Sequence, residues 1–149
     1  MSDVVVTRLI AASPATVFSF FTDLERWTSW QGVDGEVDAR PGGVFRIRMP
    51  GAEVASGRFV EVVPHRRIVF TWGWEGDAPP VPPGSTTVVV ELEPADEGTL
   101  LRLTHRGLAP PPVAEHHRDG WELYLDRLRV RAAGGDPGPA PTPGRTPSG

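Results

Sequence analysis

The chain of 149 residues contains no cysteine and no lysine. Without cysteine there can be no disulfide, no thiol redox chemistry and no cysteine-ligated zinc. The basic side chains are all arginine, and acidic residues outnumber them, which gives a net charge of −4. A nucleic-acid-binding protein usually presents a basic face, so this balance argues against nucleic acid as a partner.

The sequence also has no apolar run long enough to cross a bilayer. Its first ten residues, MSDVVVTRLI, lack the basic segment and hydrophobic region of a secretory signal, so we expect a cytoplasmic protein without membrane insertion. A chain of this length fits one domain, which we place at residues 1–133. Residues 134–149 are rich in glycine and proline and hold no large apolar side chain, so we expect them to form a disordered tail.

The first part of the chain predicts a strand followed by two short helices. Residues 4–10 are mostly apolar and β-branched, which is typical of a strand. Ser13 precedes a proline in the manner of a helix N-cap, and apolar residues follow at helical spacing up to Leu24. Trp27 and Trp30 stand three residues apart, which places both indoles on one side of a second helical turn.

The middle of the chain alternates apolar and polar residues and predicts antiparallel strands joined by hairpins. Pro and Gly occupy the positions that a type II turn requires within residues 40–43, so the first hairpin should turn there. Further strands are expected at residues 57–63, 67–74 and 86–93, and another should contain residues 101–105.

The stretch RIVFTWGW, residues 67–74, gathers large side chains on one face of a strand. Alternation with period two places Ile68, Phe70, Trp72 and Trp74 together. Such a stripe belongs either to a packed core or to the wall of a ligand cavity. Considered without any relative, the residues favour the core.

The carboxy-terminal part predicts one long amphipathic helix. Its apolar stripe comprises Trp121, Tyr124, Leu125, Leu128 and Ala132. The start stays open, because Asp119 and Glu122 have capping-box spacing while the residues from Val113 onward are also compatible with a helix. Gly120 marks either a start at that point or a close approach to another backbone.

Together these elements predict an α+β fold with one curved antiparallel sheet that covers its apolar face with the final helix. Four segments carry a resemblance: DARPGGVFRIRM, GRFVEVVPHRRIVFTWGW, TTVVVELEP with GTLLRLTHRGL, and GWELYLDRL. Their order and spacing resemble bacterial single-domain proteins similar to the carboxy-terminal domain of the Hsp90 ATPase activator Aha1, in the START and Bet v 1-like (SRPBCC) superfamily. The resemblance covers residues 4–133. It implies a helix-grip fold, in which the sheet wraps around the long helix and leaves a hydrophobic cavity between them.

The resemblance further implies that inward side chains line this cavity and bind a small hydrophobic ligand. The expected lining residues are Phe18, Phe21, Trp27, Trp30, Phe45, Ile47, Met49, Phe59, Phe70, Trp72, Trp74, Val88, Val90, Leu103, His105, Trp121 and Leu125. The proline-rich loop at residues 78–84 should form a stiff rim. We assign no catalytic residue, no metal ligand and no cofactor.

Titratable residues offer little support for catalysis. His105 is in phase with Leu103 and should point inward as a hydrogen-bonded structural residue. Glu61 is expected to be solvated or paired with an arginine. His116 and His117 are adjacent, so their side chains diverge by about 100° on a helix and make a poor metal pair.

Two other functions remain open through the same resemblance. A polyketide cyclase or hydrolase would need two titratable groups that converge in the cavity, and the mostly apolar inward set counts against it. We expect a co-chaperone that acts on Hsp90 least, because the sequence has no counterpart of the additional amino-terminal domain of such activators.

Overall fold

A computed structural model describes residues 2–77 and 79–138. The elements are, in chain order, β1 (Ser2–Ile10), α1 (Pro14–Ser19), α2 (Leu24–Trp27), β2 (Asp34–Val37), β3 (Val44–Arg48), β4 (Val54–Val63), β5 (Arg67–Trp72), β6 (Thr86–Ala95), β7 (Gly98–Leu108) and α3 (Pro111–Ala132). The strands form one antiparallel sheet in the order β1-β7-β6-β5-β4-β3-β2.

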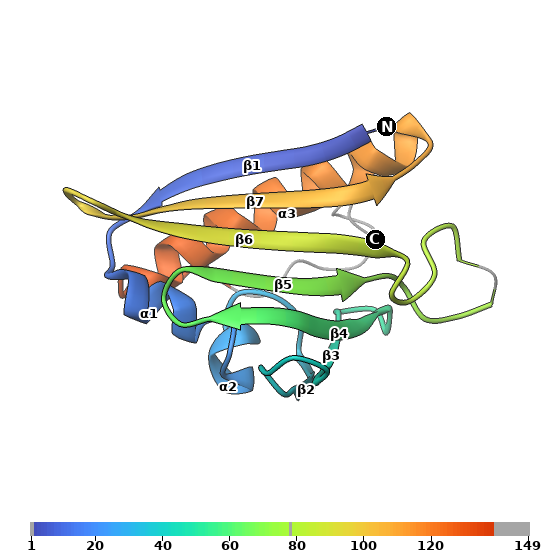
Figure 1. The fold of residues 1–149 in the computed structure, drawn as a ribbon, viewed down its shortest axis with the longest axis horizontal. Helices are drawn as coiled ribbons and strands as arrows, with labels where there is room; N and C mark the ends of the chain where they lie inside the picture. Colours follow the sequence, from blue (N-terminus) through green and yellow to red (C-terminus); the bar gives the residue numbers. More distant parts are fainter. Residues whose placement is uncertain (1, 78, 139–149) are drawn as a thin grey trace.

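The sheet curves around α3, which runs behind β1, β7 and β6 in Figure 1. The short helices α1 and α2 lie at one end of the sheet, and the loop between β5 and β6 lies at the other (Figure 1). This arrangement confirms the predicted α+β helix-grip fold. No helix of the described residues is both long and apolar enough to span a membrane.

The predicted turn chemistry at the start of the chain is confirmed. The Ser13 hydroxyl accepts a hydrogen bond from the Thr16 backbone N–H at 3.2 Å and caps α1. The second predicted helix is also confirmed: α2 begins at Leu24, and Asp23 caps it through the Arg26 N–H at 3.2 Å. Apolar spacing carried the first predicted helix as far as Leu24, whereas α1 ends at Ser19.

The hairpin between β2 and β3 turns where the sequence predicts it. Gly42 has a φ of +85°, and the Gly43 N–H donates to the Arg40 carbonyl at 2.7 Å. A positive φ at the third turn position defines the type II geometry, which glycine adopts without strain.

The long helix α3 begins at Pro111 and passes through Asp119 and Gly120 without interruption. Of the two starts left open by the sequence, the earlier one is therefore correct. The predicted stripe is buried, and Ala114 and His117 extend it toward the amino-terminal end of the helix.

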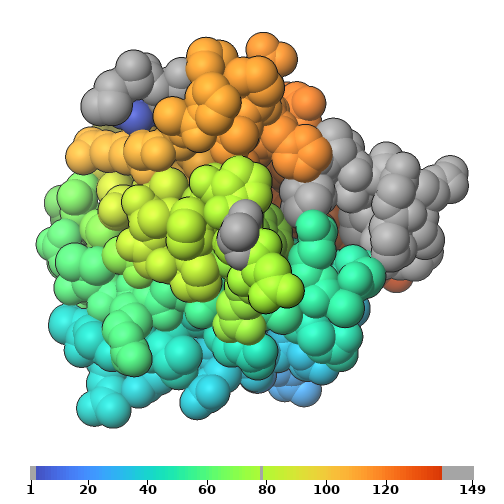
Figure 2. Space-filling model, turned by 90° about the vertical axis from the view of Figure 1, so that its right-hand side faces the viewer, coloured from blue at the N-terminus to red at the C-terminus, as the bar shows by residue number. Residues whose placement is uncertain are grey.

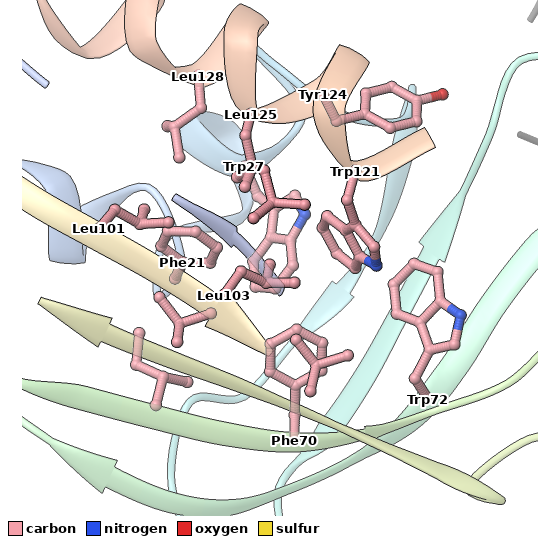
Figure 3. Close-up of a cluster of buried hydrophobic side chains, with 14 of the residues drawn as sticks. Phe21, Trp27, Phe70, Trp72, Leu101, Leu103, Trp121, Tyr124, Leu125 and Leu128 are labelled. Atoms are coloured by element: carbon pink, nitrogen blue, oxygen red, sulfur yellow. The ribbon is translucent and has the colours of Figure 1, made fainter. Parts of the chain in front are cut away.

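The inward face of β5 answers the question posed by RIVFTWGW. Ile68, Phe70 and Trp72 are 0–2% exposed and belong to the core, whereas Trp74 lies beyond the strand end and is half-buried. Aromatic rings, among them Phe21, Trp27 and Phe70, fill the space under α3 (Figure 3). The ring centroids of Phe45 and Phe70 are 4.6 Å apart. The stripe thus faces a packed core along most of its length and a more open region only at its end.

The carboxy-terminal end of α3 is tied to neighbouring segments through arginines. Arg127 donates to the Trp30 carbonyl at 3.1 Å and to the Gly138 carbonyl at 3.2 Å. Residues 134–138 are thus placed against the helix, while residues 139–149, most of the expected disordered tail, lie outside the described residues.

Candidate functional site

Two hollows lie at the end of the sheet opposite the short helices. The inner one, called the inner cavity below, has a volume of about 10 Å³, which is room for roughly one oxygen-sized group. It is lined by Gln31, Met49, Trp72, Trp74, His117, Gly120, Trp121 and Tyr124. The sheet, α3 and the segment after α2 all contribute to this lining.

The outer hollow, called the groove below, has a volume of about 390 Å³. Its lining residues are Glu53, Trp74, Glu75, Pro79, Pro80, Val81, Pro112, Val113, His116 and His117. Figure 2 faces this end, where the β5–β6 loop (yellow-green) meets the first turns of α3 (orange) and the β3–β4 turn (teal). Prolines and valines from two segments give the groove stiff apolar walls.

Trp74 and His117 belong to both linings and so form the partition between the inner cavity and the groove. The indole N–H of Trp74 donates to Nε2 of His117 at 3.0 Å. His117 Nδ1 lies 2.9 Å from the Val113 carbonyl, which can only accept, so Nδ1 carries the proton. His117 is therefore held in its neutral Nδ1–H tautomer, and burial lowers its pKa.

His105 anchors a buried chain of hydrogen bonds behind the partition. The Trp121 indole N–H donates to His105 Nδ1 at 2.9 Å, so the ring proton lies on Nε2. Nε2 then donates to the Thr86 hydroxyl at 2.8 Å, because that hydroxyl gives its own proton to the Trp72 carbonyl. Burial, reinforced by the nearby His117, holds the pKa of His105 well below its ordinary value.

These two histidines converge, with ring centroids 5.4 Å apart, but they are poorly suited to acid–base catalysis. Each imidazole has both nitrogen atoms engaged in a hydrogen bond within the protein. A general base needs a free lone pair within reach of the substrate proton. In the arrangement described, His105 and His117 serve as acceptors that position the indoles of Trp121 and Trp74.

Trp72 carries an unsatisfied donor next to these networks. Of the described residues, its Nε1 is the buried side-chain nitrogen or oxygen atom that lacks a hydrogen-bond partner. The residue is 2% exposed and lines the inner cavity. Figure 3 shows its indole nitrogen on the ring edge turned away from Trp121.

Carboxylates stand at the outer margin of the groove. Glu75 forms a bidentate pair with Arg46 at 2.8 and 3.0 Å, and this hydrogen-bonded pairing lowers the pKa of its carboxyl group. Glu53 contributes a second carboxylate from the β3–β4 turn. No group of three or more metal-ligating side chains occurs within the described residues.

The structure brings four of the seventeen expected lining residues to these hollows: Met49, Trp72, Trp74 and Trp121. Twelve others pack in the core and line neither hollow: Phe21, Trp27, Trp30, Phe45, Ile47, Phe59, Phe70, Val88, Val90, Leu103, His105 and Leu125. Phe18 is at the far end of the sheet, in edge contact with His65. A ligand contact for these thirteen residues stays a prediction.

Sequence reasoning missed several lining residues, and some of them left a signal. His117 stands four residues before Trp121 and seven before Tyr124, so it continues the helical stripe. That signal was hidden because the helix start stayed open. Gln31, Glu53 and His116 left none, since their positions depend on how separate segments meet.

Other charged residues lie outside the candidate site. Glu61 pairs with Arg67 at 3.0 Å on the outer face of the sheet, as expected for a solvated or arginine-paired residue. Arg67 also pairs with Glu91, within a depression of about 900 Å³. Ligand sites are mostly apolar with few polar groups, so this strongly charged depression is the weaker candidate.

A curved antiparallel sheet that holds a long carboxy-terminal helix, with an apolar hollow at one end, defines a helix-grip protein. Residues 11–133 match the family described as Activator of Hsp90 ATPase homolog 1-like protein, and the chain belongs to this family. No curated protein matches the chain.

Solved structures of bacterial proteins share this fold. An AHSA1-like protein from Rhizobium etli is 46% identical, with 96% of this chain and 90% of that chain covered and a TM-score of 0.72. CalU16 from Micromonospora echinospora is 29% identical, with 92% of this chain and 77% of that chain covered and a TM-score of 0.71. The Aha1 dimer from Colwellia psychrerythraea, at 20% identity, 91% and 98% coverage and a TM-score of 0.78, is similar in fold alone.

Proposed function

We propose that the protein binds a small hydrophobic molecule in the groove, with the partition of Trp74 and His117 at its inner end. The observation that carries this proposal is the apolar groove itself. Its volume of about 390 Å³ falls within the roughly 300–1,000 Å³ range of small-molecule sites. The interior between sheet and helix is occupied by aromatic side chains, so the groove is the space available to a ligand.

The composition of the groove supports the same proposal. Pro79, Pro80 and Pro112 present rigid apolar rings, so little conformational entropy is lost when a ligand covers them. Trp74 adds a large aromatic surface that is half-buried before any ligand arrives. Apolar contact of this kind tolerates many ligand shapes.

The alternative of a polyketide cyclase or hydrolase finds less support. It needs a titratable pair free to exchange protons with a substrate, and His105 and His117 have their nitrogens engaged. The family description also suggests co-chaperone activity. Binding to purified bacterial Hsp90 with a change in its ATP turnover would favour that function, and no described surface feature points to it.

Titration with Nile red, an uncharged apolar dye whose emission rises in apolar surroundings, tests the proposal. The wild-type protein should bind the dye saturably. The substitution Val113→Glu places a charge in the groove wall, and covering a charge with an apolar ligand is costly. It should weaken binding at least tenfold, which corresponds to about 1.4 kcal/mol.

A matched control uses the same helix and the same change. Val130 is 37% exposed on α3 and lines neither hollow, so Val130→Glu should bind Nile red as the wild type does. Equal binding by the Val113→Glu and wild-type proteins, or no saturable binding by the wild type, would contradict the proposal.

A further inference from the structure

We propose that the indole N–H of Trp72 recognises the ligand, which therefore carries a neutral hydrogen-bond acceptor, such as a ketone or quinone carbonyl, at its inner end. This inference rests on the proposed function and adds the chemical class of the ligand. The apolar body of the molecule lies in the groove, and its carbonyl oxygen reaches the inner cavity.

The indole N–H of Trp72 differs from the other four indole donors of the protein. An indole N–H can only donate, and a buried donor without a partner is unfavourable. The four other indoles have acceptors: Gln31 Oε1 for Trp27, the Phe20 carbonyl for Trp30, His117 Nε2 for Trp74 and His105 Nδ1 for Trp121. The packing thus supplies an acceptor at every indole except the one at the inner end of the proposed site.

The ring neighbours His105 and Phe45 have no acceptor to spare for Trp72. His105 is in ring contact at 5.7 Å, but its two nitrogens are already bonded to Trp121 and Thr86. Phe45 stacks at 5.6 Å and has no polar atom. These two ring neighbours therefore offer Trp72 no acceptor, and the inner cavity that Trp72 lines has room for one.

The volumes of the inner cavity and the groove limit the shape of the ligand. The inner cavity, at about 10 Å³, accepts one oxygen-sized group but not a ring. The groove is large enough for a body of several rings or a branched chain. A molecule that fits both is an apolar body with a single oxygen at its tip, which is the shape of an aryl ketone or a quinone.

The charges around the two hollows disfavour a ligand with a carboxylate at its inner end. A buried anion is costly unless a cation or several donors compensate it. The described lining of both hollows includes no arginine, and the chain has no lysine. Glu53 would repel an anion at the entrance, whereas the charge of Glu75 is offset by Arg46. A neutral carbonyl avoids both costs.

The carbonyl reaches Trp72 when the indole of Trp74 turns away from His117. The backbone of this segment is held independently, by the Trp74 N–H on the Val81 carbonyl at 2.7 Å and the Glu75 N–H on the Val54 carbonyl at 2.9 Å. The inference therefore requires a rotamer change of Trp74 within a fixed loop, at the cost of its hydrogen bond to His117.

The test compares two probes of nearly equal shape in two proteins. 2-Acetylnaphthalene has the carbonyl, and in 2-isopropenylnaphthalene a CH₂ group replaces the oxygen. Calorimetric titration gives the ratio of the two dissociation constants for the wild type and for Trp72→Phe, which keeps an aromatic ring but lacks the N–H. We expect the wild-type preference for the ketone, expressed as this ratio, to fall by roughly threefold to tenfold in Trp72→Phe, as for one neutral hydrogen bond.

A second readout follows the donor itself. In ¹H–¹⁵N spectra of the wild type, the indole resonance that is missing from Trp72→Phe should shift downfield with the ketone and stay nearly unchanged with the alkene. Trp30→Phe is the matched control, because Trp30 is equally buried but lines neither hollow. Its ratio of dissociation constants should equal that of the wild type.

The outcomes separate this inference from the proposed function. If both probes bind and Trp72→Phe leaves their ratio unchanged, the Trp72 inference is wrong while the groove remains a ligand site. If neither probe binds the wild type, the proposed function fails and the inference fails with it. Should Trp72→Phe not fold, through-space contacts to the rings of Phe45 and His105 assign the Trp72 indole resonance in the wild type, and its failure to shift at saturation with the ketone overturns the inference.

Discussion

His105 and His117 are two buried imidazoles that the surrounding hydrogen bonds fix in opposite tautomers. His105 carries its proton on Nε2 and accepts from Trp121, and His117 carries its proton on Nδ1 and accepts from Trp74. Protonation of either ring would turn the acceptor nitrogen into a donor that faces an indole N–H. At the residue scale, therefore, proton binding and native packing oppose each other.

This opposition predicts that the free energy of unfolding decreases between pH 7 and pH 5.5. Burial lowers the pKa of both histidines below the value of 6.5 that they have when solvated, so the unfolded chain binds more protons than the native state as the pH falls. The stability contribution is present above pH 6.5 and is lost as the pH falls below it, by at most about 1.3 kcal/mol per histidine between pH 7 and pH 5.5. Urea unfolding at the two pH values measures the loss.

Adjacent substitutions on α3 provide the control for this measurement. His117→Gln keeps an acceptor for Trp74 but removes one titrating group, so its loss of stability should be about half that of the wild type. His116→Gln removes only a minor contribution to the lowered pKa of His117, so it should reduce the loss far less than His117→Gln does. A wild-type protein equally stable at both pH values would contradict the prediction. Arg46 lowers the pKa of the exposed Glu75 carboxyl from 4.5, so protonation of Glu75 affects the free energy of unfolding only at lower pH.

At the scale of elements, the loop between β5 and β6 determines the shape of the groove. Gly73 packs directly beneath this loop, and a Cβ at that position would overlap the Pro82 carbonyl oxygen. The glycine in RIVFTWGW is therefore required by a close approach of two backbones.

Gly73→Ala should push the loop away from the sheet. We expect a decrease in the free energy of unfolding of about 1–3 kcal/mol, as for overpacking of a core, and weaker Nile red binding, because Pro79, Pro80 and Val81 move with the loop. Chemical denaturation and dye titration check the two effects. Ser85→Ala removes a hydrogen bond to the same Pro82 carbonyl without adding volume, so its dye affinity should match that of the wild type. Unchanged stability in Gly73→Ala would show that the loop yields freely.

The elements were largely predictable from the sequence because their signals are local. The cap at Ser13, the type II turn at residues 40–43 and the period-two pattern of β5 each depend on a few consecutive residues. The candidate site was much less predictable. The contact between Trp74 and His117 joins residues 43 positions apart, and neither the alternation of β5 nor the stripe of α3 indicates it.

At the scale of the whole molecule, aromatic packing leaves little of the expected cavity under α3. Trp27, Trp30, Trp72 and Trp121 are 0–2% exposed, and Trp74 at the groove is half-buried. The resemblance predicted a cavity along the helix, but the size of these rings decides how much space remains. The sequence does not reveal this directly, since it gives the volume of each side chain but not the spacing of the helix and the sheet.

We therefore expect tryptophan emission that is shifted to short wavelength and poorly quenched by acrylamide. Trp74 should contribute most of the quenchable emission, so acrylamide should quench the tryptophan emission of Trp74→Phe even less than that of the wild type. Trp30→Phe, which removes a fully buried indole, should leave the quenching constant nearly unchanged. Strong quenching that persists in Trp74→Phe would mean that the interior is open to small solutes.

The cluster of Trp72, Trp74 and Trp121 also has an optical consequence. Ring centroids 5.1 and 5.4 Å apart place the three indoles close enough for their electronic transitions to couple. Coupled chromophores in a fixed chiral arrangement give paired bands of opposite sign in near-ultraviolet circular dichroism. A ligand that turns Trp74 away would alter these bands even if it absorbs no light itself, so the protein carries a built-in reporter for colourless ligands.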